Sequence, residues 1–347
     1  MQRHISVVEN FLISTNILCL TNRKTRSYNT NLGSFMQYRL PKNLRITTFA
    51  FTLTPLEEII LPAYAGAAIR GGFGYAFKKI ACVSREKDCN TCMLRGKCIY
   101  SYTFESPTDN KGHQYVPQPF VIEPPEMGGK FVGEDELVFR LTLIGKAIEY
   151  LPYFIYTFEE LGQVGLGKGR GRYKVVKVTS NGKTIYSGES KTLENKEDMI
   201  RRAVDFERIS SKCNQLTINF LTPTRIKYRG KLTKDINFEI LMKSLLRRIS
   251  LLSRYHCDEK WRVDFNSILS EAKKIETKAK QLNWYDWERY SKRQNTRMKL
   301  GGFLGKLTVA GDLNSFMPIL KVGEYIHVGK ATTFGLGKYK VQNMKKG

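Results

Sequence analysis

An internal repeat constrains the fold of this chain more than any other feature of its sequence. When the sequence is shifted by 166 positions, residues 139–175 align with residues 305–341 without a gap. The identical pairs are Leu141/Leu307, Thr142/Thr308, Gly145/Gly311, Pro152/Pro318, Gly169/Gly335, Gly171/Gly337, Tyr173/Tyr339, Lys174/Lys340 and Val175/Val341. With a shift of 168, the segment 53–55 (LTP) falls on 221–223. Landmarks in the same order predict one structural unit that occurs twice.

The apolar pattern predicts the order strand, helix, strand, helix, strand in the first half. The expected ranges are a strand at 46–54, a helix that begins at 62, a strand at 137–143, a helix around 151–161 and a strand at 173–178. For the second half we expect a strand at 216–221, helices at 238–252 and 267–282, a strand at 306–309, a helix at 313–320 and a strand at 338–341.

This order predicts an α+β protein built from two tandem ferredoxin-like (RRM-like) domains. We place the domains at 46–205 and 206–347, with a small four-cysteine insert at 81–100 and a cleft between the two halves. Residues 1–45 hold seven Lys or Arg and one acidic residue without helical or strand periodicity, so we expect a basic, flexible extension there.

The charge of the chain predicts a polyanionic partner. It contains 57 Lys and Arg against 32 Asp and Glu, a net charge of +25. Without the basic extension the balance is still 50 against 31, or +19, so the positive charge belongs to the folded part. Nucleic acid is the expected partner, ahead of an anionic membrane surface. No apolar run of 18 residues is present, so we expect no membrane span.

Four of the seven cysteines lie close together, with the spacing Cys82-x6-Cys89-x2-Cys92-x5-Cys98. One tight cluster within an odd total favours a reducing cytoplasm and a metal site over a secreted disulfide framework. Four thiolates can close a tetrahedral structural zinc site, and an iron–sulfur cluster is the second choice. Reduced thiols without a ligand remain the alternative.

Two glycine-rich turns alternate glycines with cations. The first spans 165–172 (GLGKGRGR), and 329–330 (GK) together with 335–338 (GLGK) offer a second copy. Glycines allow successive N–H groups to form an anion nest, and cations add charge around it. We therefore expect RNA phosphates to be held by Lys168, Arg170, Arg172 and Lys338, with Gly169, Gly335 and Gly337 in the turns. Tight turns with solvated cations are the alternative.

His327 lies beside the second glycine turn. A neutral imidazole there could take the proton of a 2′-hydroxyl group or protonate a leaving 5′-oxygen. A histidine that hydrogen-bonds the RNA backbone or the end of a strand explains the same position equally well.

Several segments resemble the CRISPR precursor-RNA-processing endoribonucleases of the RAMP superfamily. The C-terminal segments are 290–294 (YSKRQ), 300–305 (LGGFLG) and 327–339 (HVGKATTFGLGKY), which are the most specific part. Residues 61–66 (LPAYAG) and 69–74 (IRGGFG) resemble the first helix of that family. The resemblance covers about 46–345, and a four-cysteine insert after this helix also occurs in some relatives.

The resemblance implies metal-independent cleavage of CRISPR repeat RNA. The 2′-hydroxyl group would attack the adjacent phosphate and leave a 2′,3′-cyclic phosphate and a 5′-hydroxyl group. Many members place a histidine on or near the first helix, whereas this helix offers Tyr64 and Arg70. We therefore assign His327 as acid or base, Tyr64 to proton transfer, and Arg70 and Lys330 to stabilisation of the pentavalent phosphate. Arg293 is a further expected RNA ligand.

Two other functions stay open at this point. A nuclease-inactive RAMP subunit would only hold guide RNA in a CRISPR effector complex. A zinc-stabilised DNA-binding protein ranks last, because the cysteine segment lacks a finger-type recognition helix. The expected partners are precursor crRNA and other CRISPR effector or adaptation proteins, in the cytoplasm and without a membrane. A homodimer is neither required nor excluded.

Overall fold

The computed structural model describes residues 38–85, 88–105, 116–194, 199–208, 214–291 and 296–343. The first half contains β1 (Arg45–Pro55), β2 (Ile59–Leu61), α1 (Gly66–Ala81), α2 (Ile99–Phe104), β3 (Phe120–Glu123), β4 (Gly129–Phe131), β5 (Leu137–Ile144), α3 (Leu151–Val164), β6 (Tyr173–Ser180), β7 (Lys183–Ser187) and β8 (Arg201–Arg202). The second half contains β9 (Gln215–Thr224), β10 (Ile226–Tyr228), β11 (Lys231–Thr233), α4 (Phe238–His256), α5 (Phe265–Lys273), β12 (Glu276–Tyr285), β13 (Glu288–Ser291), β14 (Thr296–Lys299), β15 (Gly302–Ala310), α6 (Met317–Ile326) and β16 (Tyr339–Asn343).

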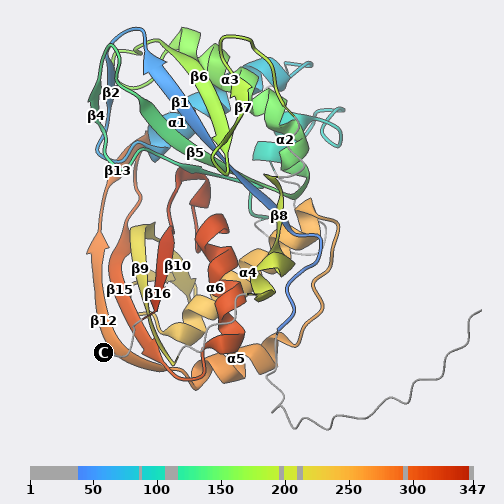
Figure 1. Ribbon diagram of the computed structural model, residues 1–347, viewed down its shortest axis with the longest axis vertical. Coiled ribbons are helices and arrows are strands. Elements are labelled where there is room, and N and C mark those ends of the chain that lie inside the picture. The colour runs from blue at the N-terminus through green and yellow to red at the C-terminus, as the bar shows by residue number, and fades with distance from the viewer. Residues whose placement is uncertain are drawn as a thin grey trace, which may run out of the picture. The chain divides into compact units, whose positions relative to one another are not determined.

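The first half contains an antiparallel sheet with the strand order β3-β5-β1-β6-β7. Strand β8 pairs with the start of β1 (Figure 1). Strand β1 is rich in β-branched and aromatic residues, which suit a pleated and half-buried surface. Helices α1 and α3 pack together over this sheet. The ring of Phe73 on α1 stacks on Phe154 and Phe158 of α3, at centroid distances of 5.1 and 4.8 Å.

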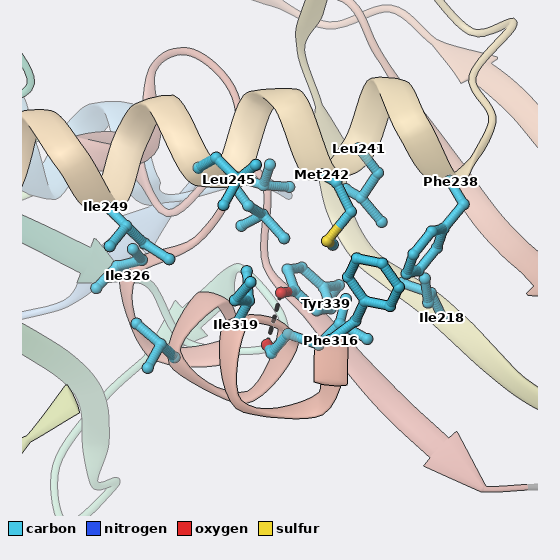
Figure 2. Packing of buried hydrophobic residues seen from close by; sticks show 14 of the residues in the cluster. Ile218, Phe238, Leu241, Met242, Leu245, Ile249, Phe316, Ile319, Ile326 and Tyr339 are labelled. Atoms are coloured by element: carbon cyan, nitrogen blue, oxygen red, sulfur yellow. Dashed lines mark hydrogen bonds between the residues drawn. The ribbon is translucent and has the colours of Figure 1, made fainter. Parts of the chain in front are cut away.

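The second half repeats this architecture with the strand order β12-β15-β9-β16. Its core lies between the sheet and helices α4 and α6 (Figure 2). Leu241, Leu245 and Ile249 recur at helical spacing on α4 and are fully buried. The buried hydroxyl group of Tyr339 on β16 donates a hydrogen bond of 2.6 Å to the carbonyl oxygen of Leu320 on α6, which ties the helix to the sheet.

Both halves follow the order β-α-β-β-α-β. Strand β1 corresponds to β9, β3 to β12, β5 to β15 and β6 to β16, and the corresponding strands occupy the same positions in their sheets. This arrangement is the ferredoxin-like motif, present twice, and it confirms the fold class inferred from the repeat. Within the motif, the apolar pattern missed one strand in each half, namely β3 and β12, and it also missed the short strands outside the motif.

The predicted helix at 267–282 is correct only at its start. Helix α5 ends at Lys273, and the chain then continues as β12, which pairs with β15 from Glu276 to Tyr285. Strand β12 lies at the sheet edge and is largely exposed, so its lysines face solvent. Charged edge strands resist unwanted strand pairing, and they lack the apolar alternation by which a strand is recognised in a sequence.

The end of the predicted basic extension belongs to the folded part. Leu40 and Leu44 are buried in the core of the second half, and the indole N–H of Trp261 donates to the carbonyl oxygen of Arg39 at 2.8 Å. The extension predicted for 1–45 is therefore too long at its C-terminal end, and its part at 1–37 lies outside the described residues. Among the described helices, none has the length and apolar character needed to cross a membrane.

His256, the last residue of α4, is buried where the second half meets the first. Its Nε2 atom lies 2.8 Å from the carbonyl oxygen of Pro117, and its Nδ1 atom lies 3.1 Å from the hydroxyl group of Tyr102. These contacts suit a neutral ring that donates from Nε2 and accepts at Nδ1. Burial, with a smaller effect of Arg248, lowers the pKa of His256 to about 4.

We expect this histidine to make the protein sensitive to mild acid. Because the unfolded chain binds the proton near pH 6.5 and the folded chain only near pH 4, stability falls as the pH drops through this interval. Between about pH 7.5 and about pH 5.5 we expect the free energy of unfolding to fall by about 1 kcal/mol, which urea unfolding at the two pH values would measure. The His256→Gln variant keeps a donor for Pro117 but does not titrate, so its stability should not change over this interval. An equal loss in both proteins would contradict the assignment.

Candidate nucleic-acid interface

The segment 327–338, here called the junction loop, connects α6 to β16 and packs against the first half. The hydroxyl group of Tyr64 donates to the carbonyl oxygen of Phe334 at 2.7 Å. The guanidinium group of Arg70 on α1 lies over the rings of Phe104 and Phe334, at 4.9 and 5.1 Å from their centroids. Two of the four predicted catalytic residues therefore contact the junction loop from the first helix region.

His327 begins the junction loop and has no exposed surface. Its Nε2 atom lies 3.0 Å from Oε1 of Glu123, and its Nδ1 atom lies 3.1 Å from the carbonyl oxygen of Leu336. Both ring nitrogens are therefore engaged within the protein. This geometry favours the alternative that the sequence left open, a histidine that bonds the end of an element, over the predicted role as acid or base.

Glu123, at the end of β3, connects this histidine to a lysine of the junction loop. Its Oε2 atom accepts a hydrogen bond of 2.7 Å from Nζ of Lys338. Burial alone raises the pKa of Glu123, but the hydrogen bond and charge of His327, with the charge of Lys338, outweigh it and lower that pKa to about 2. The ammonium group of Lys338, predicted to bind RNA, is thus paired with a carboxylate at the junction.

Lys330 has a different environment from the other predicted catalytic residues. Its backbone N–H donates to the carbonyl oxygen of Arg225 at 2.9 Å, which holds the junction loop beside the start of β10. Burial lowers the pKa of Lys330, and the positive charges of three neighbouring side chains lower it further. These neighbours are Lys227 on β10, Arg247 on α4 and Arg225 between β9 and β10.

We call Lys330, Arg225, Lys227 and Arg247 the cation cluster. Lys227 and Arg247 are exposed, whereas Arg225 is half-buried and donates through Nη1 to the carbonyl oxygen of Gly301. The carboxylate of Asp286 also acts on Arg225. An anion would offset the positive charges that surround Lys330, so this arrangement suits phosphate groups. Lys330 was predicted from the sequence, but its three neighbours were not, because they lie 83 to 105 positions earlier in the chain.

The first glycine-rich turn presents its cations to solvent, but it does not form the expected anion nest. Lys168, Gly169 and Arg170 are exposed. The N–H groups of Leu166, Lys168 and Arg170 each donate to a carbonyl oxygen of the protein, so they are not directed at a ligand. The exposed guanidinium group of Arg172 pairs with Glu57 at 2.7 Å, a contact that RNA phosphate would have to replace.

The second glycine-rich turn lies inside the junction. A Cβ atom on Gly335 would come within 2.6 Å of the carbonyl oxygen of Ile122, and one on Gly337 within 1.9 Å of that of Val328. These two glycines therefore allow the close packing of the junction loop rather than an open turn. Arg293, the remaining predicted RNA ligand, lies outside the described residues.

The four cysteines of the insert are free thiols. The Sγ atoms of Cys82 and Cys92 both approach the hydroxyl group of Ser84, at 4.0 and 3.3 Å. Across the described part of the chain, no three His, Cys, Asp or Glu side chains are arranged to hold a metal ion. The arrangement of Cys82, Cys89, Cys92 and Cys98 thus does not support zinc, which stays a prediction from their spacing.

Solved structures share this fold over most of the chain. A product complex of Cas6 (TTHB231) aligns with a TM-score of 0.54 at 16% identity, covering 86% of this chain and all of that one. Thermus thermophilus Cas6 (TTHB231) aligns with a TM-score of 0.51 at 15% identity, over 86% of this chain and 99% of that one. A partial Cas6-RT-Cas1–Cas2 complex gives 0.53 at 14% identity, over 88% of this chain and 47% of that one.

Sequence comparisons agree with the structural ones. Residues 218–339, which include most of β9, the cation cluster and the junction loop, match the family model of the CRISPR-associated endoribonuclease Cas6. Residues 44–198 match a family model described as an N-terminal domain (AF_1859_N). An uncharacterised protein of Archaeoglobus fulgidus is 25% identical over 311 residues, which span 85% of this chain and all of that protein. The second half of the chain is therefore similar in sequence to the CRISPR-associated endoribonuclease Cas6 over residues 218–339, and the chain shares its fold with solved Cas6 structures.

Proposed function

We propose that this protein binds CRISPR repeat RNA and cleaves precursor crRNA by attack of a 2′-hydroxyl group on the adjacent phosphate, without a catalytic metal. The products would be a 2′,3′-cyclic phosphate and a 5′-hydroxyl group. The cation cluster is the observation that carries the proposal, because it gathers four positive side chains from three segments around one place. The match of residues 218–339 to the family model of a CRISPR-associated endoribonuclease supports the same substrate.

The cluster offers two contributions that this reaction needs. Fixed positive charges stabilise the pentavalent phosphate, in which negative charge increases. A lysine whose pKa is lowered by burial and by neighbouring positive charges also gives up its proton more readily to the leaving 5′-oxygen. We therefore assign Lys330 to charge stabilisation and proton donation, and Arg225, Lys227 and Arg247 to phosphate binding. The proton of the attacking 2′-hydroxyl group passes to solvent water in this scheme.

Tyr64 and Arg70 act on the junction loop rather than on the reacting atoms in this proposal. The hydroxyl group of Tyr64 is bonded to a backbone carbonyl group, and burial raises its pKa well above its usual range. Arg70 lies over two aromatic rings. Both side chains fix the loop that carries Lys330, which makes them positioning residues.

An RNA-holding subunit without nuclease activity is the second candidate. The observation that favours it is the burial of His327, whose two ring nitrogens are both occupied, in a chain whose first helix has no histidine. Such a subunit would bind repeat RNA with the same dependence on salt but would release no product. Association with CRISPR adaptation proteins would fit either candidate, since one structural neighbour belongs to a Cas6-RT-Cas1–Cas2 complex.

Incubation with repeat RNA in EDTA distinguishes the two candidates. We expect cleavage with a 2′,3′-cyclic phosphate end, and none when the scissile nucleotide carries 2′-deoxyribose, because the nucleophile is then missing. The Lys330→Ala variant should cut about 10²–10³-fold more slowly. Lys183→Ala, on the edge strand β7, is the matched control and should cut at the normal rate. Tight binding of repeat RNA with no cleavage would establish the RNA-holding subunit instead.

A further inference from the structure

Next to the cation cluster, β10 and β11 form a short hairpin with an unusual turn. Tyr228 pairs with Lys231 across the hairpin, so Arg229 and Gly230 alone form the turn. Both have positive φ, at 48° and 82°. Such two-residue turns match the twist of the strands and usually carry Asn-Gly, because a side chain such as arginine is strained in this backbone conformation. Arginine at this position therefore points to a use for its side chain.

That side chain lies against an exposed aromatic ring. The Cζ atom of Arg229 is 5.3 Å from the centroid of the Tyr228 ring, and Tyr228 is 38% exposed. The apolar core does not need this tyrosine, since Ile226 supplies the buried contact of β10. An exposed tyrosine beside arginine offers a flat, positively charged surface of the kind on which nucleic-acid bases stack.

The other face of the hairpin contributes to the cation cluster. Lys227 and Tyr228 are consecutive on a strand, so their side chains point to opposite faces. Lys227 acts electrostatically on Lys330, and β10 packs against α4, which carries Arg247. The hairpin thus has phosphate-binding charge on one face and an aromatic ring with a second cation, Lys231, on the other.

We infer that the tip of this hairpin, Tyr228 with Arg229, stacks on an unpaired base of bound RNA, next to a phosphate held by Lys227 and Lys330. This inference rests on the proposed function and adds to it a requirement of the substrate. The RNA must offer a single-stranded nucleotide at the hairpin. Because the tyrosine contacts the flat face of a base by stacking, the site accepts different bases.

Two short oligomers test the inference separately from cleavage. One is a 12-nucleotide oligoadenylate, and the other is a 12-unit abasic ribose-phosphate chain with the same number of phosphates. Fluorescence anisotropy should show that the protein binds oligoadenylate at least about fivefold more tightly. In Tyr228→Ala this preference should disappear while affinity for the abasic chain stays within about twofold. Tyr228→Trp should keep the preference, because tryptophan also stacks.

Three further variants complete the test. Lys227→Ala should weaken binding of both oligomers alike and reduce the dependence of affinity on salt. Arg229→Asn suits the turn and should lower the preference without unfolding the hairpin. Tyr153 on α3 is 48% exposed, and Tyr153→Ala should change neither affinity.

Full preference for oligoadenylate in a folded Tyr228→Ala protein would overturn the inference, and so would equal binding of both oligomers by the wild type. Either result can occur while repeat RNA is still cleaved, in which case the proposed function stands. Conversely, the preference and its loss in Tyr228→Ala can be observed in a protein that cuts no RNA.

Discussion

Replacing Glu123 with alanine will lower the free energy of unfolding by about 3 kcal/mol. The carboxylate accepts hydrogen bonds from His327 and Lys338, and its side chain is only 10% exposed. Without it, the Nε2 atom of a fully buried histidine loses its partner, and the lysine loses its counter-charge. The loss falls at the contact between the two halves, since β3 belongs to one and the junction loop to the other.

Urea unfolding at neutral pH measures this loss, and two variants separate its causes. Glu123→Gln keeps an acceptor for the histidine but removes the charge that Lys338 faces, so we expect an intermediate loss. Adding Lys338→Met removes that unmatched ammonium group, so the double variant should lose less than the sum of its two single variants. Because the pKa of Glu123 is lowered to about 2, its contribution is present above about pH 4.5 and disappears as the pH falls toward 2.

Glu136→Ala is the matched surface control. Glu136 is 58% exposed in its side chain and lies 3.9 Å from Lys177, so its removal should cost less than about 1 kcal/mol. An equally small loss in Glu123→Ala would show that the carboxylate does not hold the junction together.

The fold could be predicted because the same order of sequence landmarks occurs in both halves of the chain. Matching landmarks in the two halves fixed the equivalence of β5 with β15 and of β6 with β16, and the structure places each pair at the same position in its sheet. The two strands of the repeated motif that were missed, β3 and β12, have no periodic apolar signal. Strand β3 is four residues long and wholly buried, so it shows no alternation. Strand β12 is a charged edge strand, and its sequence was predicted to be helical. Only its pairing with β15 identifies it as a strand.

The site was predicted less well because it depends on contacts between distant segments. His327 was chosen for its chemistry, but its Nε2 atom is bound to Glu123, 204 positions earlier. An acidic residue at the end of a short apolar segment carries no sequence signal for such a partner. Lys330 was recognised from a local motif, whereas the charges around it come from β10 and α4. The Arg229-Gly230 turn was visible in the sequence, and its departure from Asn-Gly is a signal that could have been used.

Replacing Gly66 with alanine will destabilise the protein, although the same change at Gly71 on the same helix will stabilise it. A Cβ atom at Gly66 would lie 2.0 Å from the carbonyl oxygen of Phe334, whereas nothing lies within 4 Å of one at Gly71. Alanine favours the helix over glycine, so Gly71→Ala should gain up to about 1 kcal/mol. Gly66→Ala must instead displace the backbone of the junction loop, at a cost of about 2 kcal/mol.

The same pair of variants tests whether the junction loop positions the site. The carbonyl group that Gly66→Ala displaces is the one that Tyr64 binds, and Lys330 lies four residues earlier in the same loop. We therefore expect Gly66→Ala to slow the cleavage of repeat RNA at temperatures where the protein is still folded, while Gly71→Ala cuts at the normal rate. Urea unfolding and initial rates measure the two effects side by side. If Gly66→Ala loses stability but still cleaves repeat RNA at the full rate, the contact between the first helix and the junction loop is not needed to position Lys330.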